Sequence, residues 1–202
     1  MPFFIMQEAI DHLIQKDETL KYILETFGNP VILKREEGFA SLCHIILEQQ
    51  VSIASAKACY QKLEHYLGAV TPQILSHASD DTLKKCGISR QKILYIKDLA
   101  AKVIAKEIDF TSFASKSEEQ VRKELIALKG VGNWSADVYL MFCLQSPDIV
   151  PLGDIAIKNT LTALYNCHTH EEMVAVSEQW KPFRTFASYT IWHYYLSKRN
   201  RI

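Results

Sequence analysis

Apolar residues recur at helical spacing along almost the whole 202-residue chain. Phe39, Leu42 and Ile46 share one face of a predicted helix, and Ile93 and Ile96 are spaced in the same way further along. No stretch of useful length alternates between apolar and polar residues, as a half-buried β-strand would. The pattern therefore predicts an all-α protein of about ten to twelve helices.

Polar caps mark where several of these helices begin. Ser117–Gln120 and Thr169–Glu172 both have the Ser/Thr-x-x-Gln/Glu arrangement of a capping box. Gly68 ends one predicted helix, and Thr71-Pro72 opens the next with a cap and a proline at its first position.

The C-terminal half contains the most informative pattern. A predicted helix ends at Leu128, the turn Lys129–Asn133 follows, and a second helix starts at about Trp134. Gly130 and Gly132 have no Cβ, so the backbone can turn sharply there and expose N–H groups at a helix N-terminus, which suits a phosphate. Taken alone, the same glycines also fit a plain corner between two helices.

One acid follows this hairpin. A polar loop with two prolines leads to Asp154, which precedes a further apolar helix. From its position alone, Asp154 fits an ordinary helix N-cap, because aspartate side chains accept hydrogen bonds from the first backbone amides of a helix.

The two blocks together are more specific than either block alone. The segment 128–136 (LKGVGNWSA), followed by 151–158 (PLGDIAIK), resembles the helix-hairpin-helix DNA glycosylases, and most closely their 3-methyladenine DNA glycosylase II branch. The resemblance covers the chain roughly from Gly28 to its end. It includes four other blocks in family order: Ile45–Ser52, Gly87–Lys92, Trp180–Arg184 and Ile191-Trp192.

The resemblance implies the HhH-GPD glycosylase fold, in which two helical subdomains flank an active-site cleft. One subdomain is expected to combine residues 1–36 with 152–202. The other is expected to span 37–151 and to end in the helix-hairpin-helix, at about 118–145. Some relatives carry an N-terminal β domain, and with only about thirty residues before Pro30 we expect no such domain in this chain.

The resemblance makes Asp154 the catalytic residue. Cleavage of an N-glycosidic bond passes through an oxocarbenium-like sugar, which needs a nearby negative charge and a directed water. Alkylated purines already carry a positive charge and leave without strong acid assistance, so a single carboxylate suffices. Catalysis and capping of the helix are compatible roles for Asp154, because the positive end of a helix favours an anion.

The position of Trp134 predicts a monofunctional enzyme. Bifunctional relatives have a Schiff-base lysine two residues after the second hairpin glycine, where this chain has Trp134. Trp134 and Trp192 also match tryptophans of the family's base pocket, although core packing is the commoner role of tryptophan. Val138 replaces an aromatic residue of some relatives, which would leave the pocket less stacked.

The resemblance also implies how DNA is held. The helix hairpin would bind a phosphate, and a side chain would fill the space left by the flipped nucleotide. Alternatively, Gln50 is an ordinary polar residue at a helix end and Lys158 a solvated surface lysine. The predicted DNA contacts are the backbone of Gly130, Val131 and Gly132, the Ser135 hydroxyl, the Gln50 wedge and Lys158.

Charge and cysteine content limit the other possibilities. Lys plus Arg and Asp plus Glu both number 23, so affinity for undamaged DNA should be modest and sensitive to salt. The five cysteines form no C-x-x-C, and none follows Cys167, so no zinc site, disulfide framework or iron–sulfur cluster of the family is expected. We expect no cofactor or metal, apart from a monovalent cation that hairpin carbonyls can hold in the family.

The predicted function is excision of 3-methyladenine, and also of 7-methylguanine, from duplex DNA, leaving an abasic site for base excision repair. We expect a monomer without a signal peptide, cytoplasmic in a bacterium or archaeon and nuclear in a eukaryote. Two alternatives stay open: a glycosylase for etheno- or deaminated purines, and a non-catalytic helix-hairpin-helix protein that binds damaged DNA.

Overall fold

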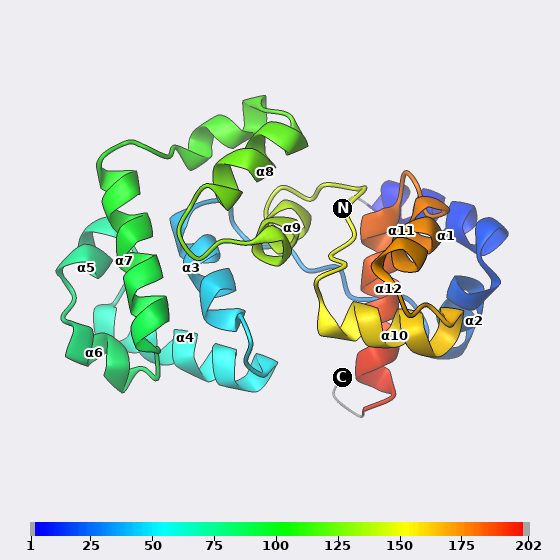
Figure 1. Cartoon of the computed structure of the whole chain (residues 1–202), viewed down its shortest axis with the longest axis horizontal. Helices are drawn as coiled ribbons and strands as arrows, with labels where there is room; N and C mark the ends of the chain where they lie inside the picture. Colours follow the sequence, from blue (N-terminus) through cyan, green and yellow to red (C-terminus); the bar gives the residue numbers. More distant parts are fainter. Residues whose placement is uncertain (1–2, 200–202) are drawn as a thin grey trace. The chain divides into compact units, whose positions relative to one another are not determined.

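The computed structural model describes residues 3–199, and within them it contains only helices (Figure 1). The all-α prediction is confirmed, and so are both capping boxes, at Ser117 and Thr169. Twelve α-helices and one 3₁₀ helix follow one another in this part of the chain: α1 (Phe3–Lys16), α2 (Glu18–Phe27), α3 (Phe39–Glu48), α4 (Ile53–Leu67), α5 (Pro72–His77), α6 (Asp80–Lys85), α7 (Arg90–Ile104), η1 (Phe110–Ser115), α8 (Glu118–Ile126), α9 (Asn133–Phe142), α10 (Ile155–Tyr165), α11 (His170–Glu178) and α12 (Arg184–Ser197).

The contacts divide the chain into two compact units. One unit combines the residues up to Lys34 with those from Leu140 onward, and the other spans Arg35–Tyr139. The first unit is called the terminal unit below, and the second the central unit. The subdomain limits expected from the family, at 36/37 and 151/152, remain a prediction, and their outer ends lie beyond the described residues.

A buried carboxylate connects the N-terminal and C-terminal helices of the terminal unit. Asp17 caps α2 by accepting the amides of Thr19 and Leu20, both at 2.9 Å. The same carboxylate accepts the Tyr165 hydroxyl at 2.9 Å and the Trp180 indole N–H at 2.7 Å. Because Asp17 is only 6% exposed, these donors compensate for the cost of burying its charge. The resulting packing of α2 and α10 against α12 supports the segment that carries Asp154.

The central unit is built around α3, α7 and the aromatic residues that precede the hairpin. The edge of the Phe113 ring meets Tyr139 with 6.0 Å between centroids, and Phe110 lies 5.9 Å from the same ring. These buried rings anchor the 3₁₀ helix η1, an element that the sequence pattern did not predict. The Tyr139 hydroxyl accepts the Gly38 amide at 2.8 Å, which fixes the start of α3.

No helix among the described residues is long and apolar enough to cross a membrane.

Candidate functional site: a helix hairpin and a capped aspartate

The two helices of the predicted hairpin are α8 and α9, and the turn between them depends on a glycine. Gly130 has a φ of +81°, and a Cβ at this position would lie 2.2 Å from the Tyr95 ring. Both the backbone conformation and the lack of space therefore require glycine at 130. Gly132 is different, because a Cβ there would meet no atom within 4 Å. Space beside the Gly132 backbone is what an approaching phosphate would need.

Some backbone groups of the hairpin are hydrogen-bonded within it and are therefore not available to a ligand. The Val131 amide donates to the Leu128 carbonyl at 3.1 Å, and the Val131 side chain is buried. The Gly132 carbonyl accepts the Ala136 amide at 3.0 Å, which starts α9. The N-terminus of α9, rather than the Val131 amide, is thus the part of the turn suited to an anion.

Two side chains outside the hairpin hold it in place, and neither was assigned a role from the sequence. The Gln49 amide nitrogen donates to the Gly130 carbonyl and to the Ser135 hydroxyl, both at 2.8 Å. Lys92 in turn donates to the carbonyls of Leu47 and Gln49, at 2.8 and 2.7 Å. Both residues fall in blocks that resemble the glycosylases, which was the available signal. Ser135 itself is buried, at 2% exposure.

The first two turns of α9 carry two of the predicted pocket residues. Trp134 is half-buried and Val138 is buried, and a separation of four residues places them on one face of the helix. This arrangement is compatible with a pocket wall as well as with core packing.

An ion pair joins the two hairpin helices on another face. Asp137 of α9 is 2.6 Å from Arg122 of α8, and Asp137 is only 7% exposed. Burial raises the pKa of the Asp137 carboxyl to about 6, although Arg122 opposes the shift. Loss of solvation therefore outweighs the attraction of the guanidinium.

This raised pKa predicts a pH-dependent contribution to stability. The folded state holds a proton on Asp137 below about pH 6, whereas the unfolded state holds it only below about pH 4. The stabilisation that comes from this proton is fully present below the pKa of Asp137 in the unfolded state, and it is lost as the pH rises through 6. Between pH 7 and 4.5, the free energy of unfolding of the parent should gain about 2 kcal/mol relative to Asp137→Asn. Urea unfolding of both proteins at each pH measures this difference, and a difference that does not change with pH would contradict it.

In the terminal unit, Asp154 is the N-cap of α10, as predicted. Its Oδ1 accepts the amides of Ala156 and Ile157, at 2.8 and 3.2 Å. The same oxygen accepts the indole N–H of Trp192 at 3.1 Å. The structure thus joins two predicted site residues, and it does so through a hydrogen bond that the sequence did not predict. Ile155, beside Asp154, is 66% exposed.

Two further aromatic residues surround Trp192. Phe142 and Tyr189 both meet its ring edge-on, with centroids 5.9 and 5.8 Å away. Their own rings are stacked at an interplanar angle of 12°. These contacts fix the orientation of the indole, and therefore the direction from which it donates to Asp154. Neither residue was singled out in the sequence.

The loop that leads towards Asp154 is tied to the first turn of α12. Arg184 contacts Asp148 through two nitrogens, at 2.8 and 2.9 Å. The Thr185 hydroxyl donates to the Ser146 carbonyl at 2.6 Å and accepts the Ile149 amide at 3.0 Å. The same helix carries Trp192, so one rigid element positions both the loop and the donor to Asp154.

The remaining predicted DNA contacts lie on the surfaces of their units. Lys158 is exposed, one turn after Asp154. Gln50 is exposed in the turn between α3 and α4, with a positive φ of 55°. Both positions are accessible to DNA, and both also fit the simpler roles of a surface lysine and a residue at a helix end.

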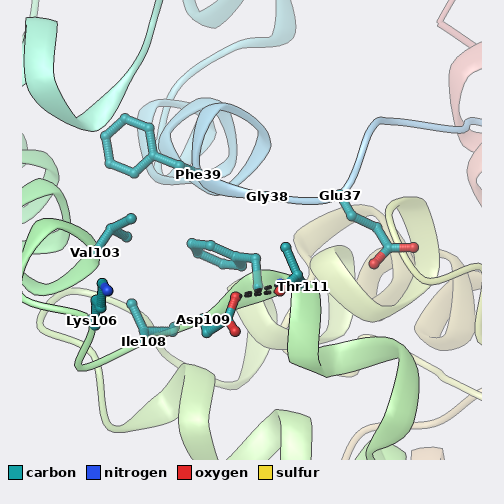
Figure 2. Close-up of a pocket in the computed structure, with 9 residues that line it drawn as sticks. Glu37, Gly38, Phe39, Val103, Lys106, Ile108, Asp109 and Thr111 are labelled. Carbon is teal, nitrogen blue, oxygen red and sulfur yellow. Dashed lines mark hydrogen bonds between the residues drawn. The ribbon is translucent and has the colours of Figure 1, made fainter.

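A separate hollow in the central unit contains none of the predicted site residues (Figure 2). Its volume is about 700 Å³, and Phe39, Val103 and Ile108 supply much of its apolar lining. At its edge Asp109 accepts the hydroxyl and the amide of Thr111, as the dashed lines in Figure 2 show. Among the described residues, no group of three or more His, Cys, Asp or Glu side chains could hold a metal ion.

The sequence profile of the HhH-GPD superfamily of base excision DNA repair proteins matches residues 43–184, which include both the hairpin and Asp154. This chain belongs to the HhH-GPD superfamily. Two fungal comparisons extend the likeness over nearly the whole chain. DNA-3-methyladenine glycosylase 1 of Schizosaccharomyces pombe is 26% identical over 197 residues, which cover 93% of this chain and 86% of that protein. The S. pombe 3-methyladenine DNA glycosylase Mag1, solved in complex with abasic DNA, superposes with a TM-score of 0.84 at 25% identity, covering 95% of this chain and 97% of that one.

A bacterial structure agrees with this placement. The DNA-3-methyladenine glycosidase of Bacillus halodurans has a TM-score of 0.79 at 28% identity, covering 95% of this chain and 91% of that one. As an HhH-GPD protein, this chain is a base excision DNA repair protein, and the relatives named above place it among the DNA glycosylases, which act on DNA.

Proposed function

We propose that this HhH-GPD protein is a monofunctional glycosylase that flips alkylated purines out of duplex DNA and hydrolyses their N-glycosidic bonds. Its substrates are 3-methyladenine and 7-methylguanine, and its product is an abasic site. The observation that carries the proposal is the Asp154 carboxylate, held at the start of α10 by two amides and the Trp192 indole. Similarity to glycosylases that act on 3-methyladenine supports the choice of substrate.

Asp154 supplies the negative charge that the reaction needs. As the glycosidic bond breaks, its electron pair moves to the base, neutralises the positive charge on the alkylated purine and leaves an oxocarbenium-like sugar. The carboxylate stabilises that sugar and accepts a proton from the water that adds to C1′. Three N–H donors on Oδ1 fix the direction of the carboxylate before substrate arrives, so no reorganisation is needed during the reaction.

Aromatic side chains account for the preference for cationic bases. A positively charged purine gains about 0.5–2 kcal/mol over an aromatic face. We assign this stacking to Trp134 and Trp192, with Val138, on the same face of α9 as Trp134, as the third residue of the proposed pocket. Trp192 is suited to it because Phe142 and Tyr189 hold its ring while its edge is bonded to Asp154.

The hairpin binds the DNA backbone in this proposal. The N-terminus of α9 offers backbone donors near Gly132, where space is open, and a monovalent cation on hairpin carbonyls would add positive charge. Lys158 supplies a further phosphate contact, and Gln50 fills the space left by the flipped nucleotide. Ser135 supports the hairpin through Gln49, and a direct contact of its hydroxyl with DNA remains a prediction. We propose that the protein acts as a monomer.

Release of free bases from methylated duplex DNA tests the function. The parent protein should release 3-methyladenine faster than a sample without protein, with the bases identified by chromatography. DNA that contains etheno- or deaminated purines is tested in the same way. Release of those bases, without release of 3-methyladenine, would assign the enzyme to another lesion. A folded protein that binds the duplex and releases nothing would contradict a catalytic role.

Trp134, in the position of the lyase lysine, predicts the fate of the DNA strand. With no amine there to form a Schiff base, borohydride should trap no covalent protein–DNA adduct, and strands should break only after alkali treatment. A trapped adduct, or strand breakage at neutral pH that is proportional to base release, would contradict the monofunctional assignment.

A further inference from the structure

Gln49 occupies a position that connects three parts of the central unit. It directly follows α3, its side chain reaches the hairpin, and its backbone continues into the turn that carries Gln50. The two hydrogen bonds of its side chain hold the Gly130 carbonyl, within the glycine turn, and the Ser135 hydroxyl, in the first turn of α9. A single amide group therefore fixes the turn and the first part of α9 together.

Helix α7 holds the backbone of the same segment. Lys92 donates to the carbonyls of Leu47 and Gln49 at the C-terminal end of α3. Carbonyls at this end of a helix have no N–H donor within the helix, so Lys92 supplies the missing donors. A cation is also favoured at this end of a helix. One turn further along α7, the Tyr95 ring fills the space beside Gly130. The same helix thus supports both Gln49 and the hairpin turn.

The residues that follow Gln49 point outward. Gln50 is exposed with a left-handed backbone, and Val51 and Ile53 are 47% and 70% exposed. Two large apolar side chains with this exposure, next to the predicted wedge, suit a surface that is covered when DNA binds. The Gln49 side chain contacts the hairpin, and the Gln50 side chain is exposed. Because the two residues are adjacent in the chain, the position of Gln49 restricts the position of Gln50.

We propose that Gln49 is a positioning residue that locks the wedge turn, Gln50–Ile53, to the phosphate-binding hairpin. The wedge turn and the hairpin both bind duplex DNA in this proposal, and Gln49 positions them without touching the reacting atoms. Phosphate capture at the hairpin then sets where Gln50 enters the base stack, so that backbone binding is converted into flipping of the nucleotide. The inference rests on the proposed function of the hairpin and of Gln50, and it adds the physical connection between them.

Gln49→Met tests the connection, because it keeps the length of the side chain and removes its donors. Binding is measured on a duplex with an abasic analogue, and flipping by the fluorescence of 2-aminopurine next to that analogue. We expect the dissociation constant to change by less than about 3-fold, while the flipping signal and the rate of base release both fall about 10-fold, the factor given by about 1.4 kcal/mol. Gln61→Met, at an exposed position on α4, is the matched control and should behave as the parent.

Two further variants make the result specific. Lys92→Met removes the donors to the Gln49 segment and should show the same separation of binding from flipping if Gln49→Met fails to fold. Gln50→Ala should reduce flipping, and its combination with Gln49→Met should be less than additive because both act on one step.

The inference is overturned if Gln49→Met keeps flipping within about 2-fold of the parent, or if binding and flipping fall in the same proportion. A parent that binds the abasic duplex without any fluorescence change overturns it as well. Base release is a separate readout: flipping without release by the parent would contradict the proposed function and leave this inference supported.

Discussion

Asp154→Asn is expected to reduce the rate of base release by about 100-fold or more, while the dissociation constant for an abasic-analogue duplex stays within a few-fold of the parent value. The substitution removes the negative charge that stabilises the oxocarbenium-like sugar and the group that accepts the proton from water. In the proposed function the hairpin and Lys158 bind the DNA backbone, and the Asp154 carboxylate does not. Single-turnover release from methylated DNA and equilibrium binding, measured on the same preparations, give the two quantities.

The structure explains why this variant should remain folded. The side-chain oxygen of Asn can accept the same three N–H groups, from Ala156, Ile157 and Trp192, that Asp154 Oδ1 accepts. Asn is also a good N-cap residue. Asp154→Ala is the contrasting variant, since it should lose the cap and about 1 kcal/mol of stability as well as activity. Unchanged release by a folded Asp154→Asn would remove Asp154 from the mechanism.

Gly130→Ala is expected to lower the free energy of unfolding by about 2–4 kcal/mol, the combined cost of a left-handed alanine and of overpacking. The added Cβ would lie 2.2 Å from the ring of Tyr95, a residue of α7. The turn, α7 or the Tyr95 side chain must shift, and a shift of the turn would disturb the contacts from Gln49 to the hairpin. Denaturant unfolding measures the stability, and we expect DNA binding to fall with it.

Gly132→Ala is the matched control, and it separates folding from recognition. A methyl group at 132 meets no atom within 4 Å, so the free energy of unfolding should change by less than about 0.5 kcal/mol. Affinity for DNA should nevertheless fall about 10-fold, because the methyl group would occupy space that a bound phosphate needs. Equal destabilisation by the two substitutions would contradict the different roles given to the two glycines. Unimpaired DNA binding by Gly132→Ala would place the phosphate elsewhere.

Features encoded by neighbouring residues could be predicted from the sequence. The capping boxes at Ser117 and Thr169 and the cap at Asp154 depend on groups two or three residues apart, and the structure has all three. The all-helical fold followed from spacing alone, because amphipathic helices repeat their pattern within a few residues. The short 3₁₀ helix η1 is held by Phe110 and Phe113 against Tyr139, so its local sequence contains only part of the reason for it.

The connections that position the candidate site could not be predicted in this way. Gln49 and Gly130 are 81 residues apart, and Trp192 and Asp154 are 38 residues apart. Tyr95 determines that Gly130 must be glycine, yet nothing near either residue in the sequence points to the other. Family resemblance predicted Trp192 as a pocket residue, but its hydrogen bond to Asp154 depends on the packing of α10 against α12. The candidate site residues could therefore be selected from the sequence, whereas the residues that they contact depended on the tertiary fold.

The most direct test of the account is release of 3-methyladenine from one preparation of methylated duplex DNA by the parent, by Asp154→Asn and by buffer alone. The account predicts chromatographically identified 3-methyladenine above the spontaneous level with the parent only, together with DNA binding by both proteins. Equal release by both proteins would contradict the role of Asp154. Release by neither protein, with folding and binding intact, would contradict the assignment of this chain as an alkylpurine glycosylase.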